Sequence, residues 1–145
     1  MRLCSIVIVT AALVLGTLGV FVQAQTAASV WDGVYADAQA ARGEAAYAKD
    51  CASCHGTKLE GRGPAAPLAG PEFNSNWDGM TVGDLFSKIQ SSMPADQPGR
   101  LTPVRNAEIL AYMLKMSEFP AGSRDLDSDP EKLNQIRFEK DKPKR

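Results

Sequence analysis

The sequence Cys51-Ala52-Ser53-Cys54-His55 decides what this chain folds around. Two cysteines separated by two residues, with a histidine directly after the second, form the attachment motif of a c-type haem. The thiols of Cys51 and Cys54 can each add across one vinyl group of the porphyrin, and this tether places the imidazole of His55 under the iron as a ligand. His55 is the single histidine of the sequence, so no other imidazole competes for the iron.

Three other interpretations of these five residues are weaker. A zinc site needs further Cys or His ligands, and the remaining cysteine, Cys4, lies in an N-terminal apolar segment. A redox-active dithiol is expected near a β-α-β pattern, which is not evident here. A structural Cys51–Cys54 disulfide would leave His55 without a role. One covalently bound haem c, with its iron, is therefore the favoured prediction.

The N-terminus has the layout of a secretory signal peptide. Arg2 precedes an apolar run from Ile6 to Val22, and small residues allow cleavage after Ala24. We expect residues 1–24 to direct export to the periplasm and to be removed with Cys4. The alternative is an uncleaved anchor through residues 6–22 that holds the protein on the membrane, facing the periplasm. That run is at the short end of the roughly 17–25 residues that span a bilayer, so cleavage is favoured.

The rest of the chain is long enough for one domain and too short for two. We expect a haem-binding domain over residues 25–122 and a charged tail over 123–145, in which a short helix near Pro130 docks through Leu133 and Ile136. The whole chain of 145 residues carries a formal net charge of −1. It has no basic excess of the kind that binds nucleic acid or a polybasic-dependent membrane surface.

Helices dominate the remaining pattern, which predicts an all-α fold of three main helices and long loops wrapped around one haem. Asp37 is expected to cap a helix over residues 38–50. Thr81 and Asp84 approach a capping box before a second helix, and Thr102 with Pro103 begins a third that continues to about Met116. The Gly- and Pro-rich stretch 56–76 and the stretch 91–102 are expected to be loops, and the leader 25–35 is expected to fold over the body.

The sixth position of the iron would be open or filled by a methionine thioether, because no second histidine exists. Met113 and Met116 belong to the last helix, where methionine is usually core filler. Met80 lies just before a helix start and is expected to pack there. Met93 lies in a loop that Pro94 keeps out of helical conformation, so it can present its sulfur to the haem. Met93 is therefore the predicted second iron ligand.

Together these features resemble a small bacterial class I cytochrome c with the mitochondrial-type fold, over most of the chain from Trp31 to about Ile136. The resemblance rests on Gly43 and Tyr47, the run 51–56, Pro67-Leu68, Met93-Pro94, and residues 107–114. It implies that the first and last helices cross at a small residue. Gly43 would then lie against the face bearing Leu110 and Leu114, with Tyr47 beside it.

The resemblance also implies partners for the haem. A backbone carbonyl after the motif should accept the free N–H of His55, although this chain has Ala66 where the family usually places a proline, so the carbonyl is not fixed. Leu68 is expected to pack on the porphyrin. Trp77 is placed either as a partner of a haem propionate or as a core residue.

The function implied is that of an electron carrier rather than an enzyme, with no catalytic residues and no small-molecule substrate. The expected partners are exported redox proteins: a dehydrogenase as donor, by analogy a quinoprotein, and a terminal oxidase or reductase as acceptor. Two alternatives remain. One is a haem enzyme or a gas or redox sensor with an open or labile sixth position. The other is a permanently bound haem subunit of a larger oxidoreductase, docked through the tail.

Overall fold

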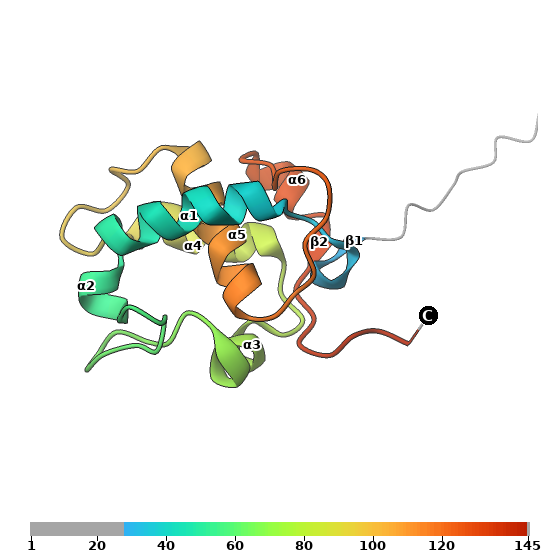
Figure 1. Ribbon diagram of the computed structural model, residues 1–145, viewed down its shortest axis with the longest axis horizontal. Helices are drawn as coiled ribbons and strands as arrows, with labels where there is room; N and C mark the ends of the chain where they lie inside the picture. The colour runs from blue at the N-terminus through green and yellow to red at the C-terminus, as the bar shows by residue number, and fades with distance from the viewer. Residues whose placement is uncertain (1–27, 145) are drawn as a thin grey trace, which may run out of the picture.

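The computed structural model describes residues 28–144, and the predicted signal peptide lies outside them (Figure 1). The described chain is mostly helical, as predicted. Its elements in chain order are β1 (Ala28–Ser29), the 3₁₀ turn η1 (Val30–Asp32), α1 (Asp37–Asp50), α2 (Ala52–His55), α3 (Gly70–Trp77), α4 (Val82–Ser92), α5 (Pro103–Met116), α6 (Pro130–Leu133) and β2 (Ile136–Arg137).

Helices α1 and α5 cross at Gly43, and this crossing organises the core (Figure 1). A Cβ atom at Gly43 would overlap the backbone carbonyl of Glu108 and touch Cβ of Tyr112. The prediction that Gly43 marks the crossing is confirmed, but its predicted partners, Leu110 and Leu114, are wrong. Both leucines are fully buried on other sides of α5, because α5 is surrounded by the core along most of its length.

The predicted helix starts are confirmed at two of three positions. Thr81 and Asp84 form a reciprocal capping box at α4, and Thr102 caps α5 with Pro103 in its first turn. The prediction that Asp37 caps α1 is wrong. Asp37 is the first residue inside the helix, where its charge suits the helix dipole, and its carboxylate accepts a bond from Nζ of Lys115 at 2.8 Å.

All of helix α3 except Trp77 lies in the stretch 56–76, which the sequence predicted to be a loop, so that prediction is wrong over residues 70–76. Glycines and prolines dominate that stretch, but Pro71 occupies the first turn of α3, where a missing N–H costs nothing. Phe73 is buried and packs against Trp77 one turn later, with ring centroids 6.4 Å apart. Packing of these two aromatic residues on the core therefore outweighs the loop-forming composition.

The C-terminal segment is part of the folded core. Strand β2 pairs in parallel with β1, and the side chains of Leu133 and Phe138 are fully buried. The ring of Phe138 meets those of Phe73 and Phe119 edge-on, with centroids 5.7 and 5.3 Å apart. Side chains from residues 123–138 thus complete the hydrophobic core.

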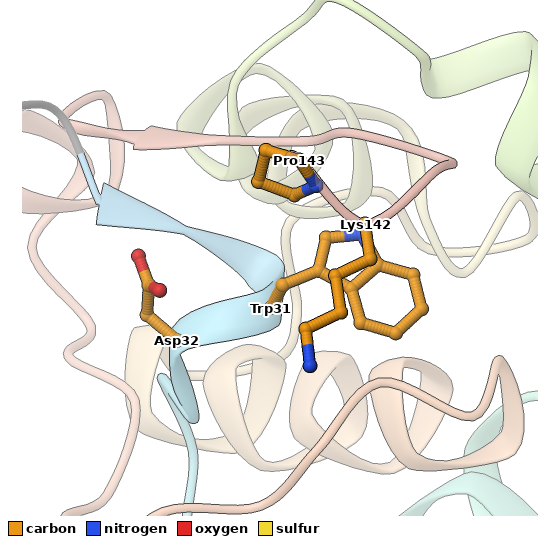
Figure 2. Close-up of a pocket in the computed structure, with 4 residues that line it drawn as sticks. All are labelled: Trp31, Asp32, Lys142 and Pro143. Atoms are coloured by element: carbon orange, nitrogen blue, oxygen red, sulfur yellow. The ribbon is translucent and has the colours of Figure 1, made fainter. Parts of the chain in front are cut away.

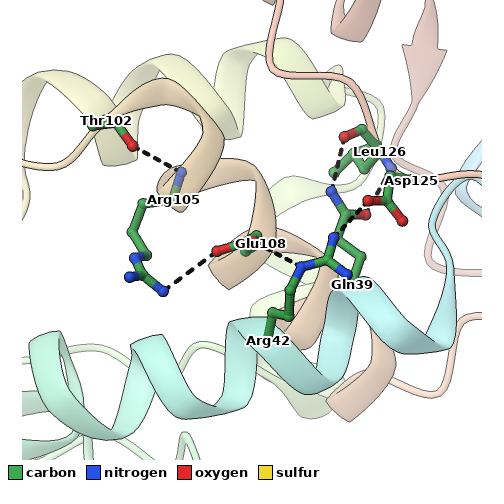
Figure 3. A network of polar contacts seen from close by, with 7 residues as sticks. All are labelled: Gln39, Arg42, Thr102, Arg105, Glu108, Asp125 and Leu126. Carbon is green, nitrogen blue, oxygen red and sulfur yellow. Dashed lines mark hydrogen bonds and ion pairs between the residues drawn. The ribbon is translucent and has the colours of Figure 1, made fainter.

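Polar contacts hold α1, α5 and the C-terminal segment together, as Figure 3 shows. The side-chain amide of buried Gln39 donates to the carbonyl of Leu126 at 2.9 Å and accepts from its N–H at 2.6 Å. Arg42 pairs with Glu108 of α5 and with Asp125. The single amide of Gln39 therefore satisfies both backbone groups of a buried residue, which fixes where the segment crosses α1.

The two ends of the described chain meet on one side of the molecule. The indole N–H of Trp31 donates to the carbonyl of Glu139 at 2.8 Å. A small surface pocket is lined by Trp31, Asp32, Lys142 and Pro143, with the Lys142 side chain alongside the Trp31 ring (Figure 2). Within residues 28–144, the helices are too short or too polar to cross a membrane.

Candidate functional site

The two cysteines and the histidine lie on one short turn at the end of α1. Cys51 is the C-cap of α1, with its N–H donating to the carbonyl of Tyr47 at 2.9 Å. The carbonyl of Cys51 then accepts the N–H groups of Cys54 and His55 at 3.2 and 3.0 Å, which winds the chain into α2. No disulfide joins the two cysteines; Cys51 is half-buried and Cys54 is exposed.

The imidazole of His55 is oriented by a backbone carbonyl. Its Nδ1 atom lies 2.8 Å from the carbonyl oxygen of Ala66, a distance that fits an N–H donor at Nδ1. With the proton on Nδ1, the Nε2 atom carries the free lone pair that binds a metal. Ala66 thus supplies the carbonyl that the sequence left unassigned, and its side chain takes no part because only the backbone oxygen is needed.

Backbone bonds shape the loop that follows His55. The N–H of Gly61 donates to the carbonyl of His55 at 2.8 Å, and the N–H of Leu68 donates to that of Leu59 at 2.9 Å. Leu59 is fully buried although its φ of 61° is in the left-handed region. The burial of this side chain offsets the strain, so Ala66 is presented to the imidazole by a fixed loop.

Tyr47 contributes a hydrogen bond that sequence reasoning missed. Its hydroxyl donates to the carbonyl of Gly56, the residue after His55, at 2.6 Å. Burial raises the pKa of Tyr47 well above its ordinary value, so the hydroxyl remains a donor. A signal was present in the sequence, because a buried tyrosine usually needs a partner for its hydroxyl.

The four methionines of the described chain have different surroundings. Met93 directly follows α4, its N–H donates to the carbonyl of Ile89 at 2.9 Å, and its side chain is half-buried against the core. Met113 is buried in the core, 1% exposed, while Met80 and Met116 are 41% and 38% exposed. The ligation of iron by His55 and Met93 stays a prediction.

The residues around the motif suit a porphyrin. A set of apolar side chains lies against the core yet remains partly exposed, and these side chains come from the segments that flank His55 and Met93. An apolar plate covering them would remove their remaining surface from water. They are Cys51, Ala52, Leu68, Ala69, Trp77, Met93 and Leu101. Leu68, predicted to pack on the porphyrin, belongs to this set, as does Trp77, for which a propionate partner and a core residue were both predicted.

The electrostatics at Cys51 favour the neutral thiol. Burial, with smaller contributions from the adjacent Asp50 and from Cys54, raises the pKa of the Cys51 thiol to about 11, although Arg100 acts in the opposite direction. The carboxylate of Asp50 pairs with the guanidinium of Arg100 at 2.8 Å. No sequence pattern signals this pair, because its members are 50 residues apart in different elements. The surface pocket at Trp31 is lined by none of the predicted site residues.

Comparison with known proteins places the chain in a family. The family model described as cytochrome c oxidase, cbb3-type, subunit III matches residues 38–113, slightly more than half of the chain and the part that holds the motif, Leu68 and Met93. Among curated proteins, none matches this sequence.

One solved structure is similar over part of its length. A chain of the crystal structure of the sulfane dehydrogenase SoxCD from Paracoccus pantotrophus is 24% identical, with a TM-score of 0.48. The match covers 74% of this chain and 61% of that chain, so this chain spans less than two thirds of the neighbour. The family match and the motif on α2 lead to one conclusion: the chain belongs to the cbb3-type subunit III family of cytochromes, and is a bacterial class I c-type cytochrome that binds haem c covalently and serves haem-based electron transfer.

Proposed function

We propose that this protein is an exported monohaem electron carrier, with its iron held between His55 and Met93, that shuttles single electrons between exported redox proteins. The observation that carries the proposal is the 2.8 Å contact between Nδ1 of His55 and the carbonyl of Ala66. That contact leaves Nε2 as the metal-binding atom on the same turn as the two attachment thiols. A histidine oriented in this way is suited to permanent ligation rather than to proton transfer.

Bound haem c supplies a one-electron couple between ferric and ferrous iron. The residues of the chain would provide the iron ligands and limit the access of water to the ring. His55 is held from one side by Ala66, and Met93 would close the other side through a soft thioether that favours ferrous iron. Half-buried Leu68 and Trp77 would exclude water from the ring. With His55 and Met93 on the two faces of the haem, a substrate would have no free coordination position on the iron. This arrangement suits an electron carrier better than a catalyst.

The attachment turn would also provide the route for electrons. Ser53 and Cys54 are exposed, so the thioether edge of the haem would lie near the surface. Partners would dock there over a small, transient interface. We propose an exported dehydrogenase, by analogy a quinoprotein, as donor, a terminal oxidase or reductase as acceptor, and a periplasmic location after cleavage following Ala24.

Absorption spectroscopy of the exported, haem-loaded protein tests the ligation. Wild type should be low-spin in the ferric state and should not bind carbon monoxide after reduction with dithionite. Met93→Ala should bind carbon monoxide readily. Met80→Ala, which truncates an exposed methionine, is the matched control and should behave as wild type. Carbon monoxide binding by the wild type would overturn the carrier proposal in favour of a haem enzyme or sensor with an open sixth position.

A second candidate is a haem subunit permanently bound to a larger oxidoreductase. The family description, which names a subunit of an oxidase, favours considering it. Co-purification with a partner through size-exclusion chromatography, after extraction without detergent, would support it. Elution as a monomer of the cleaved chain would support the free carrier.

A further inference from the structure

The loop over residues 93–102 carries Met93 and is folded mainly on itself. The N–H of Gln97 donates to the carbonyl of Pro94 at 3.0 Å, and that of Arg100 donates to Gln97 at 3.3 Å. The N–H of Gly99 reaches back to the carbonyl of Met93 at 3.4 Å, which closes the loop into a ring. The position of Arg100 is therefore coupled to that of the Met93 backbone.

One ion pair joins this loop to the haem-attachment end of α1. The guanidinium of Arg100 donates to the carboxylate of Asp50 at 2.8 Å. The side chain of Asp50 is only 6% exposed, less than any other partner in the ion pairs of the described residues, while that of Arg100 is 37% exposed. A carboxylate so well shielded is screened less by salt than the surface pairs are, so its partner matters more.

The place of Asp50 in its helix makes the pairing necessary. Asp50 is the last residue of α1, where the helix dipole is negative and disfavours a carboxylate. Burial adds a desolvation cost that only a counter-charge with good geometry offsets. Lys49, its neighbour in sequence, is exposed and has no ion pair with it within residues 28–144. Arg100 is thus the cation that offsets the cost of a buried carboxylate at the C-terminus of α1.

These contacts form a continuous series that connects the attachment turn to the backbone of Met93. Asp50 is bonded to Cys51, the first thioether residue, and Arg100 is bonded to Gly99, whose N–H contacts the carbonyl of Met93. We propose that the Asp50–Arg100 ion pair is a latch that fixes the Met93 loop against the attachment turn and so keeps the Met93 sulfur on the iron. The inference rests on the proposed His55 and Met93 ligation. Asp50 and Arg100 are positioning residues, since neither is proposed to touch the haem.

The latch predicts how readily other ligands replace Met93. An exogenous ligand such as imidazole binds ferric iron only when the sulfur has left, so its apparent affinity scales with the fraction of open protein. Asp50→Asn and Arg100→Gln should each raise imidazole affinity about tenfold, the order expected from loss of about 1.4 kcal/mol of coupling. The double variant should match either single variant, because both remove the same contact.

The experiment is an imidazole titration of the ferric holoprotein, followed by absorption, for wild type and variants. Arg100→Lys keeps the positive charge and should restore most of the wild-type affinity. Asp37→Asn is the matched control, because it breaks a 2.8 Å ion pair between Lys115 and the other end of α1. Thermal unfolding of each holoprotein is measured alongside, because a merely structural role would lower the midpoint without changing imidazole affinity.

The outcomes separate the latch from the ligation. If Met93→Ala shows the wild-type spectrum and carbon monoxide response, Met93 is not the ligand and the latch fails with it. If Met93→Ala binds carbon monoxide but Asp50→Asn and Arg100→Gln bind imidazole with the wild-type affinity, the latch alone is overturned. A tenfold rise in the two latch variants, with none in Asp37→Asn, establishes it. Should Asp50→Asn fail to fold, the surface-accessible Arg100→Gln decides.

Discussion

Gly43 of α1 lies so close to the backbone carbonyl of Glu108 in α5 that no side chain fits between the two helices. The contact is with backbone, which cannot move aside as the end of a flexible side chain can. Glycine in mid-helix destabilises the helix by about 1 kcal/mol relative to alanine. The close approach that it allows between α1 and α5 accounts for its presence.

Gly43→Ala should therefore destabilise the protein, against the helix-propensity trend. We expect a loss of about 1–3 kcal/mol in the free energy of unfolding, because the helices must separate to admit the methyl group. Urea unfolding of the holoprotein measures it. Ala48→Gly, on the exposed side of the same helix, is the control and should cost about 1 kcal/mol from propensity alone. A Gly43→Ala variant as stable as wild type would refute the proposed close packing.

The sequence predicted that α1 and α5 cross at Gly43, but it did not predict which face of α5 meets α1. Helical spacing indicates which residues of α5 share a face, and Leu110 and Leu114 are indeed buried. It does not determine which face meets α1, because nearly every side of α5 in its middle turns is covered by core. The partners of Gly43 turned out to be Glu108 and Tyr112, a difference that depends on the packing of the whole molecule.

The C-terminal segment shows a second limit of sequence reasoning. Its charged composition suggested a tail separate from the domain, with docking through Leu133 and Ile136. Leu133 is buried, but Phe138 contributes the larger buried side chain, and Leu126 is buried as well. Isolated apolar residues among charges carry no periodic signal, so their burial depends on surfaces distant in sequence, among them Phe73 of α3 and Phe119, which contact Phe138.

Around the site, the motif predicted Cys51, Cys54 and His55. The carbonyl of Ala66 could not be predicted, because its position depends on the path of a loop.

Removing the buried hydroxyl of Tyr47 should weaken the loop after His55. Tyr47→Phe leaves the carbonyl of Gly56 without its 2.6 Å donor, and we expect a loss of about 1–2 kcal/mol in the free energy of unfolding. Tyr112→Phe is the control. Tyr112 is also largely buried, but no hydrogen bond from its hydroxyl is found within residues 28–144. Equal losses for the two variants in urea unfolding would show that the Gly56 contact contributes nothing specific.

Truncating Phe138 should show that the C-terminal segment belongs to the core. Phe138→Ala removes a fully buried ring that packs on Phe73 and Phe119, and comparable truncations cost about 3–5 kcal/mol. Arg137→Ala, which alters an exposed neighbour in β2, should change stability by less than about 1 kcal/mol. Chemical unfolding of both holoproteins is the measurement. If the two variants are equally stable, residues 123–138 do not contribute to the core in solution.

Titration of the Tyr35 hydroxyl should lower the free energy of unfolding at alkaline pH. Its hydroxyl donates to the carbonyl of Phe119 at 2.7 Å, and burial, with a smaller effect of Asp37, raises its pKa from 10.0 to about 12. Between these values the unfolded chain releases a proton that the folded protein retains, so the free energy of unfolding decreases as pH rises. The stabilisation is complete below about pH 10 and is lost as pH approaches 12.

Tyr35→Phe isolates this effect because it lacks the titrating group. Near neutral pH it should be less stable than wild type by about 1 kcal/mol, the usual contribution of one buried hydrogen bond. The difference should hold constant up to about pH 9 and then shrink as the wild type loses its advantage. Urea unfolding of both holoproteins at intervals from pH 7 to about 11.5 measures the difference directly, and any other alkaline transition affects both alike. A gap that stays unchanged throughout that range would mean that the Tyr35 hydroxyl titrates at its ordinary pKa in the folded protein.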